Sequence, residues 1–406
     1  MHVPDGFIDA PVSLAAGAVA AGAVAVSLRG ARRELAERTA PLAGLVAAFV
    51  FAVQMLNFPV GAGTSGHLLG GALAAVLVGP WTAVLCIAVV LLMQGLLFAD
   101  GGLTALGVNI TLMGVVTVAV SYAVFRALFR VLPRGPGGLG GLGLATFAAA
   151  ALSVPASALA FTGLYALGGT ADVSLTKVAA AMVGVHLLIG LGEAAITTAT
   201  VTSVAAVRPD LIHGVQGVRR PLELRTVTVA RPGDAAAAPP PERAGTVTEP
   251  ADAVPEPAGP GSRHRSPRRL WAAGLLASLV LAGIVSFYAS SDPDGLEKVA
   301  GDKGIAEEEK EHALSDSPLA DYGVEDVTDA RLSGGLAGLI GVTATLAVGS
   351  GVFVAVRRRT GSAAGPRAGA AAGAATAAGK ADSADRVSPA PGSRGTDPRP
   401  QARPEG

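Results

Sequence analysis

The first residues of the chain, MHVPDGF, carry nitrogen donors that could chelate a metal ion. A free amine at Met1, the amide nitrogen of His2 and the His2 imidazole would close small fused rings around one ion, and such rings favour a planar geometry. A planar set of nitrogens, completed by a fourth from elsewhere, suits Ni(II), with Cu(II) and Co(II) as further candidates. Taken alone, Met-His indicates a metal site only weakly, because a histidine at this position often arises by chance.

A second histidine could supply the fourth nitrogen. His67 ends the Gly-rich, uncharged stretch NFPVGAGTSGH, and the topology inferred below puts it on the same side of the molecule as His2. A neutral imidazole is a good ligand for late first-row metals, and binding would release protons, so affinity should fall below about pH 6.5. We therefore predict Met1, His2 and His67 as metal ligands. A polar anchor at the end of an apolar helix is the competing interpretation of His67.

Five further polar residues interrupt apolar stretches and are candidates for orienting the metal ligands: Ser65, Asp100, Asn109, His186 and Glu193. His186 and Glu193 are seven residues apart, about two turns along one helix face. An ionisable group inside a membrane span costs roughly 2.5 to 3.5 kcal/mol, so this pair should face the interior of a bundle. Hydrogen bonding between helices explains Asp100, Asn109, His186 and Glu193 as well as a role near a metal does.

Composition indicates the class of protein that holds these residues. The 406 residues are 50% hydrophobic and only 15% charged, and the mean hydropathy is +0.51. Apolar runs of roughly 18 to 25 residues alternate with charged turns, as expected for helices that cross a bilayer. We predict an all-α polytopic membrane protein, with lipid around it and no nucleic acid partner. The single cysteine, Cys86, excludes an intramolecular disulfide and a cysteine metal cluster.

The predicted spans form a seven-helix bundle within residues 1–207 and a C-terminal two-helix membrane domain within residues 270–357. Residues 208–269, rich in Pro, Ala and charge, are a predicted cytoplasmic linker, and residues 358–406 a predicted disordered cytoplasmic tail. The nine apolar stretches are Pro11–Leu28, Pro41–Asn57, His67–Val78, Trp81–Ala99, Gly107–Phe125, Leu144–Leu167, Lys177–Val207, Leu270–Ala289 and Leu332–Val356. The third is short for a straight span unless the residues before it extend it or it packs inside the bundle.

Basic residues predict the orientation, because Lys and Arg are enriched in cytoplasmic loops. If the third stretch spans, every basic cluster falls on one side: Arg29 to Arg38, Arg126 to Arg134, Arg208 to Arg220, Arg263 to Arg269 and Arg357 to Arg359. The amino terminus and the acidic segment Ser291–Asp329 then lie outside the cell, which predicts a multi-pass protein of the plasma membrane. The amino-terminal segment lacks Lys and Arg and carries Asp5 and Asp9, so we expect it to be retained rather than cleaved as a signal peptide.

Four ordered motifs, MHVPDGF, GTSGH, LLFADGGLTALGVN and HLLIGLGE, together resemble the CbiM/NikM family, the substrate-binding membrane components of energy-coupling factor transporters for cobalt and nickel. The resemblance covers about residues 1–207. It implies that Ni(II) or Co(II), the transported substrate, is held by the Met1 amine, the His2 amide and imidazole, and the His67 imidazole. Many members carry His where this chain has Asp100, which puts a ligand role for Asp100 in doubt.

The sequence SDPDGLEKVA, immediately after the eighth apolar stretch, resembles the PDGLE domain of small CbiN/NikN-like accessory subunits. The resemblance implies that the fused rear domain helps to load the metal. The nearby acidic run Glu307 to Glu311, with His312, could attract cations, although a solvated charged loop explains it equally well.

These observations predict the substrate-binding component of an ATP-driven importer for Ni(II) or Co(II), with no permanently bound cofactor. No G-x-x-x-x-G-K-[ST] motif occurs in the sequence, so an energy-coupling transmembrane subunit and ATP-binding subunits are the expected partners, and the chain is not expected to be an enzyme. Two alternatives remain open: a self-sufficient secondary metal transporter, and an intramembrane enzyme or receptor in which Ser65 acts beside His67.

Overall fold

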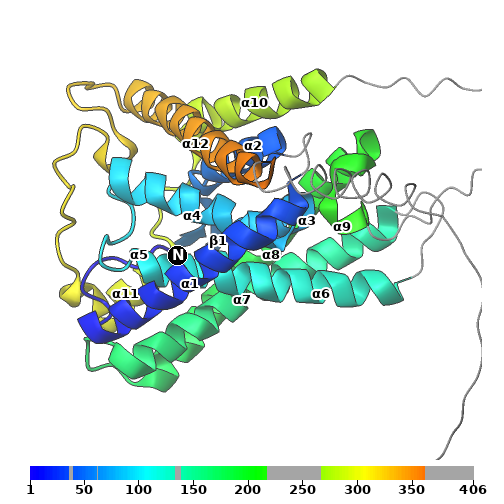
Figure 1. The fold of residues 1–406 in the computed structure, drawn as a ribbon. Coiled ribbons are helices and arrows are strands. Elements are labelled where there is room, and N and C mark those ends of the chain that lie inside the picture. Colours follow the sequence, from blue (N-terminus) through cyan, green and yellow to red (C-terminus); the bar gives the residue numbers. More distant parts are fainter. Residues whose placement is uncertain (36–39, 62, 133–138, 217–266, 362–406) are drawn as a thin grey trace, which may run out of the picture. The chain divides into compact units, whose positions relative to one another are not determined.

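The computed structural model describes residues 1–35, 40–61, 63–132, 139–216 and 267–361, and Figure 1 shows that these residues are mostly helical, with long loops at one end. The sheet in this part of the chain is one antiparallel hairpin, β1 (Phe58–Gly61) with β2 (Thr64–Gly66). Most of the predicted linker and tail, and the basic residues Arg38, Arg134, Arg219, Arg220 and Arg263 to Arg265, lie outside the described residues. The structure confirms the predicted all-α class.

Six helices of the described residues are long and apolar enough to cross a membrane. They are α1 (Ala10–Glu34), α4 (Pro80–Leu97), the continuous run Leu106–Val131, α7 (Leu139–Gly168), α8 (Leu175–Val207) and α12 (Ala330–Gly361). The run consists of α5 (Leu106–Asn109), the π-helical segment η1 (Ile110–Val116) and α6 (Thr117–Val131). These helices, with the family given below, make the chain a multi-pass membrane protein.

The third predicted span is much shorter in the structure than the sequence suggests. Only Gly71–Val78 is helical (α3), and all eight of its residues are buried. Eight residues rise about 12 Å, well short of the roughly 30 Å hydrocarbon core of a bilayer. The residues from His67 to Gly70 continue the apolar pattern but form irregular backbone, which a membrane protein tolerates where other helices shield it from lipid.

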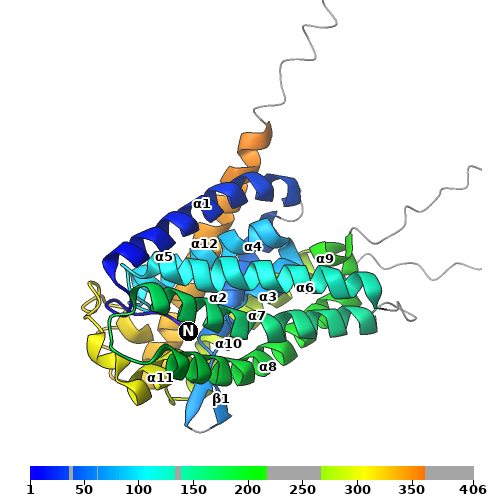
Figure 2. The same cartoon turned by 90° about the horizontal axis from the view of Figure 1, so that it is seen from below.

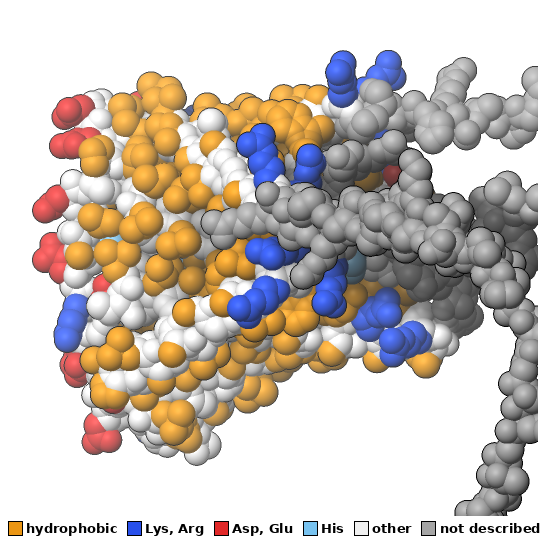
Figure 3. All heavy atoms as spheres, viewed as in Figure 1, with side chains coloured by type: hydrophobic (Ala, Val, Ile, Leu, Met, Phe, Trp, Pro, Cys, Tyr) orange, Lys and Arg blue, Asp and Glu red, His pale blue; other side chains and the backbone are white. Residues whose placement is uncertain are grey.

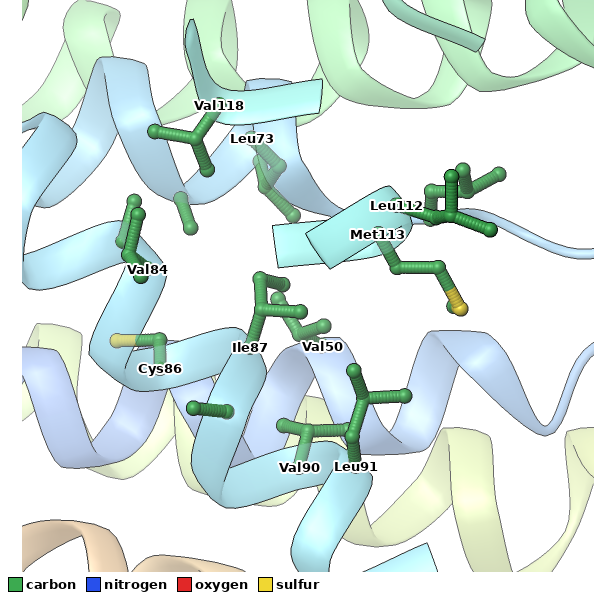
Figure 4. Close-up of a cluster of buried hydrophobic side chains, with 14 of the residues drawn as sticks. Val50, Leu73, Val84, Cys86, Ile87, Val90, Leu91, Leu112, Met113 and Val118 are labelled. Carbon is green, nitrogen blue, oxygen red and sulfur yellow. The ribbon is translucent and has the colours of Figure 1, made fainter. Parts of the chain in front are cut away.

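The centre of the bundle is built on α4, which has twelve buried residues among its eighteen. Pro80 starts α4 directly after Gly79, whose φ of 95° a residue with a side chain rarely adopts. Figure 4 shows Ile87 and Leu91 of α4 directed toward Met113 and Leu112 of η1, with Val50 of α2 (Ala40–Gln54) close by. This apolar core holds α3, η1 and α4 together beneath the polar residues discussed below.

The surface agrees with a membrane environment. Large apolar side chains such as Leu14, Leu144 and Leu187 are exposed on the helices. Figure 3 shows a broad hydrophobic band between one end that carries most of the acidic side chains and another end that carries most of the lysines and arginines. A band of this kind is the surface expected where lipid tails replace water.

Residues 267–357, called the rear domain below, pack against the helices of residues 1–216, called the front bundle, within the compact unit Met1–Arg357. Helix α10 (Pro267–Gly283) contacts α2, and the short 3-10 segment η3 (Val285–Tyr288) follows it. Helix α11 (Gly295–Lys303) lies beside α8, as Figure 2 shows. Three further 3-10 segments, η2 (Pro209–Leu211), η4 (Ile305–Glu308) and η5 (Ala320–Tyr322), and the single-turn helix α9 (His213–Gln216) complete the described elements.

Candidate metal centre

The amino-terminal segment folds back against the turn between α4 and α5. The amide N–H of Val3 donates to Asn109 Oδ1 at 2.8 Å, and Asn109 Nδ2 donates to the Val3 carbonyl at 3.0 Å. Asp5, which is buried, accepts the backbone N–H groups of Leu103 and Thr104 at 3.1 and 2.8 Å. Asn109 and Asp5 therefore position the residues that carry the predicted nitrogen ligands. Asn109 acts as a clamp on the chain next to His2.

The structure brings Met1, His2 and His67 together. The Met1 amine lies 2.5 Å from His67 Nε2, and both residues are buried. His67 Nδ1 donates to the carbonyl of Leu68 at 2.9 Å, which leaves the Nε2 lone pair facing the amine. The His2 and His67 rings stack with centroids 5.0 Å apart at 18°. In the described residues no three His, Cys, Asp or Glu side chains are arranged to hold a metal ion, so such a site depends on the backbone nitrogens of residues 1 and 2.

Each nitrogen of the His2 ring lies near a side-chain oxygen in this structure, and the neutral ring can donate its one N–H to only one of them. Its Nδ1 lies 3.2 Å from Asp100 Oδ1, and its Nε2 lies 3.2 Å from Gln94 Oε1. In the planar chelate inferred from the sequence, His2 Nδ1 would bind the metal in place of its contact with Asp100. Burial lowers the pKa of His2 to about 4, even though Asp100 opposes this shift. The ring is thus neutral at physiological pH, as a metal ligand must be.

Asp294, which the sequence analysis did not single out, reaches the same place from the rear domain. Its Oδ2 lies 2.8 Å from the Met1 amine and 3.6 Å from His67 Nε2. Burial alone would raise the pKa of Asp294, but the positive Met1 amine outweighs it and holds that pKa well below its usual range. Asp294 is the aspartate of the PDGLE motif, and this motif is the sequence feature that could have pointed to it.

Of the two ionisable residues of α8, Glu193 supports the site, whereas His186 bonds within its own helix. Glu193 is fully buried and accepts the backbone N–H groups of Leu69 at 2.7 Å and Gly70 at 3.2 Å, which follow His67 directly. His186 Nδ1 bonds to the carbonyl of Met182 at 2.7 Å. The observed bonds favour the structural interpretation of Glu193, since it holds the backbone that carries His67.

Ser65 forms hydrogen bonds to the backbone of the rear domain. Its hydroxyl donates to the carbonyl of Asp292 at 2.7 Å, and its N–H donates to the carbonyl of Pro293 at 2.9 Å. Its hydroxyl is therefore aimed at a carbonyl rather than at His67. A Ser-His nucleophile pair needs the hydroxyl within hydrogen-bond reach of the imidazole, so this arrangement speaks against the enzyme alternative.

A cavity of about 650 Å³ leads to these residues between the front bundle and the rear domain. His2, His67 and Asp294 line it, together with residues from the turn at Asp100 and from the segment around Tyr322. The acidic residues along its wall are Asp100, Asp294, Glu297, Glu309 and Asp321, against one basic residue, Arg331. The cavity is therefore suited to attract a cation.

Comparison with known proteins identifies the family. The model of the cobalt uptake substrate-specific transmembrane region, CbiM, matches residues 2–211, just over half of the chain. The chain belongs to the CbiM family, a family of cobalt and nickel transport proteins. A second model, the PDGLE domain, matches residues 268–358. The CbiM part and the PDGLE domain are therefore joined in one polypeptide, as the sequence motifs predict.

Relatives of this CbiM protein include a putative metal transport protein of Haloquadratum walsbyi, 40% identical over 214 residues that cover 52% of this chain and 93% of the relative. A putative fused nickel transport protein NikMN of Archaeoglobus fulgidus is also 40% identical, over 52% of this chain and 68% of the relative. Among solved structures, the crystal structure of a truncated transition metal transporter is 26% identical with a TM-score of 0.44, covering 51% of this chain and 99% of that one.

Proposed function

We propose that this CbiM protein is the substrate-binding component of an ATP-driven energy-coupling factor importer for Ni(II) or Co(II). The observation that carries the proposal is the direct contact between the Met1 amine and His67 Nε2, with His2 stacked beside them. The amine, the His2 amide and imidazole, and His67 would hold the metal ion, which is the substrate and not a resident cofactor. Relatives described as fused nickel transport proteins and as cobalt transport proteins support both metals as candidates.

The charge distribution supports capture of the metal outside the cell. The acidic end of the molecule, where the acidic loop approaches the amino-terminal segment through a hydrogen bond from Lys310 N–H to the Asp5 carbonyl, is opposite the basic end. Under the positive-inside rule the basic end faces the cytoplasm of a cell whose plasma membrane holds the chain. An energy-coupling subunit driven by separate ATP-binding subunits would then move the bound ion inward.

Equilibrium titration of the purified full chain with nickel or cobalt tests the metal site. The parent should bind one equivalent, with the absorption band of planar Ni(II). Inserting one glycine between Met1 and His2, or the substitution His2→Ala, should abolish binding, because ring size and the number of donors change. His67→Ala should weaken binding without abolishing it, because the amino-terminal nitrogens remain as ligands. His213→Ala removes a histidine beside Tyr122 and is the matched control. Unchanged nickel affinity in the insertion variant would refute the terminal chelate.

Membrane vesicles test the coupling. Vesicles that contain this chain without coupling and ATP-binding subunits should not accumulate nickel against a gradient. Accumulation in such vesicles would favour the secondary transporter instead, because no ATP hydrolysis could drive it.

A further inference from the structure

The PDGLE motif docks on the front bundle at a position where only glycine fits closely. A Cβ atom at Gly295 would lie 2.7 Å from Ile189 Cδ1, 2.9 Å from Val185 Cγ1 and 3.1 Å from His186 Cε1, all on α8. On the other side, Ser65 binds the backbone of Asp292 and Pro293. The residue between these two contacts is Asp294, so the docking determines where its side chain lies.

The two carboxylate oxygens of Asp294 have separate partners. Oδ1 accepts the N–H groups of Leu296 at 2.8 Å and Glu297 at 2.9 Å and so caps the amino terminus of α11. Oδ2 faces the Met1 amine and His67 Nε2. Because the cap holds one oxygen, the other is directed at the proposed metal site by the fold and not by a freely rotating side chain.

A metal ion bonded to the Met1 amine and to His67 Nε2 at about 2.0 Å would lie beside the same oxygen. Asp294 also lines the acidic cavity, with 16% of its side chain exposed, so an ion that enters the cavity can meet it. A hydrated divalent ion readily exchanges a water for a carboxylate oxygen, whereas Ni(II) in a planar nitrogen set gains little from a further oxygen. Oxygen contact first and nitrogen contact last is therefore the favourable order.

We propose that Asp294 is the transfer ligand of this metal site, which binds an arriving Ni(II) or Co(II) ion through Oδ2 and passes it to the nitrogens of Met1, His2 and His67. The inference rests on the proposed function and assigns a residue to the loading role of the rear domain. A metal–Oδ2 bond forms as a water leaves, and that bond breaks as the amine and imidazole nitrogens bind, with the displaced protons leaving to solvent. No change of oxidation state is involved.

The test is the rate at which the purified full chain takes up nickel sulfate, measured by stopped-flow, alongside the equilibrium Kd. In Asp294→Asn the amide oxygen can still cap α11, but the negative charge is lost. Association should slow by about tenfold or more. Dissociation should slow in parallel, because a transfer ligand assists both directions and leaves Kd unweakened. Asp294→Glu should restore part of the rate, and size-exclusion elution verifies that each variant is folded.

Asp292→Asn is the matched control, since it removes the same charge two residues away, where the carboxylate accepts a hydrogen bond from Ser290. Its nickel association rate should equal that of the parent. If Asp294→Asn also loads at the parent rate, the inference is wrong while the proposed function stands. Faster dissociation with a weaker Kd would make Asp294 a permanent ligand and would equally overturn the transfer role. A parent that binds neither metal would instead refute the proposed function.

Discussion

Replacing Asn109 with alanine should loosen the amino-terminal segment and weaken metal binding. Val3, which lies next to His2, is 0% exposed, and its N–H donates to Asn109 Oδ1 at 2.8 Å. The Val3 carbonyl keeps a second partner, the Gly102 N–H at 2.9 Å, so the cost falls mainly on the N–H. A buried N–H without an acceptor costs about 2 kcal/mol. In the variant, the amino-terminal segment should detach from the turn to avoid that cost. Metal binding must then bring the segment back, and the same free energy raises the nickel Kd by about 30-fold.

The assay is an equilibrium nickel titration of the purified chain. Thr111→Ala is the control, because it removes a hydrogen bond of 3.1 Å to the Ala16 carbonyl from the same continuous helix, away from the amino-terminal segment. Its Kd should match that of the parent. An Asn109→Ala protein that is folded and binds nickel with the parent Kd would show that the two bonds to Val3 do not organise the chelate.

Two further predictions concern the support of the site. Glu193→Ala removes the acceptor of the Leu69 and Gly70 N–H groups and should destabilise the fold by roughly 2 to 6 kcal/mol, with Glu193→Gln intermediate; a melting temperature equal to that of the parent would contradict this role. Because the pKa of His2 is about 4 in the fold and near 6.5 when unfolded, only the unfolded chain takes up the proton between these values. The free energy of unfolding should therefore fall by about 2 kcal/mol between pH 6.5 and 5, and His2→Gln should lose this part of the pH dependence; parallel curves for the two proteins would exclude it.

Features that depend on short stretches of sequence could be predicted. The helical class follows from the length of the apolar runs. The family could be inferred from motifs that each lie within one short stretch of sequence, and the comparisons confirm it. The candidate ligands could also be singled out, because Met1 and His2 are neighbours and a histidine after a Gly-rich stretch is conspicuous. The structure brings them together with His67.

Features that depend on packing could not be predicted. The apolar residues after His67 look like part of a span, yet only Gly71–Val78 is helical, because hydropathy does not distinguish shielding by protein from shielding by lipid. The contact between residues 1 and 294 joins the two predicted domains, and no periodicity reports on it. The sequence indicates Asp5 only as a charge of the terminal segment, whereas in the fold its carboxylate accepts the N–H groups of the turn that begins at Leu103.

Helix α11 docks on α8 within one polypeptide, so the docking needs less intrinsic affinity than an association of two separate subunits would. Two subunits at cellular concentration would need an appreciable intrinsic affinity to keep a carboxylate beside the amine, whereas covalent joining raises the effective concentration toward the millimolar range. The close contacts of Gly295 with α8 and the two hydrogen bonds from Ser65 to the backbone of Asp292 and Pro293 then add to the packing of α10 on α2 in holding α11 at the site. Fusion also fixes the stoichiometry at one PDGLE motif for each amino-terminal metal site.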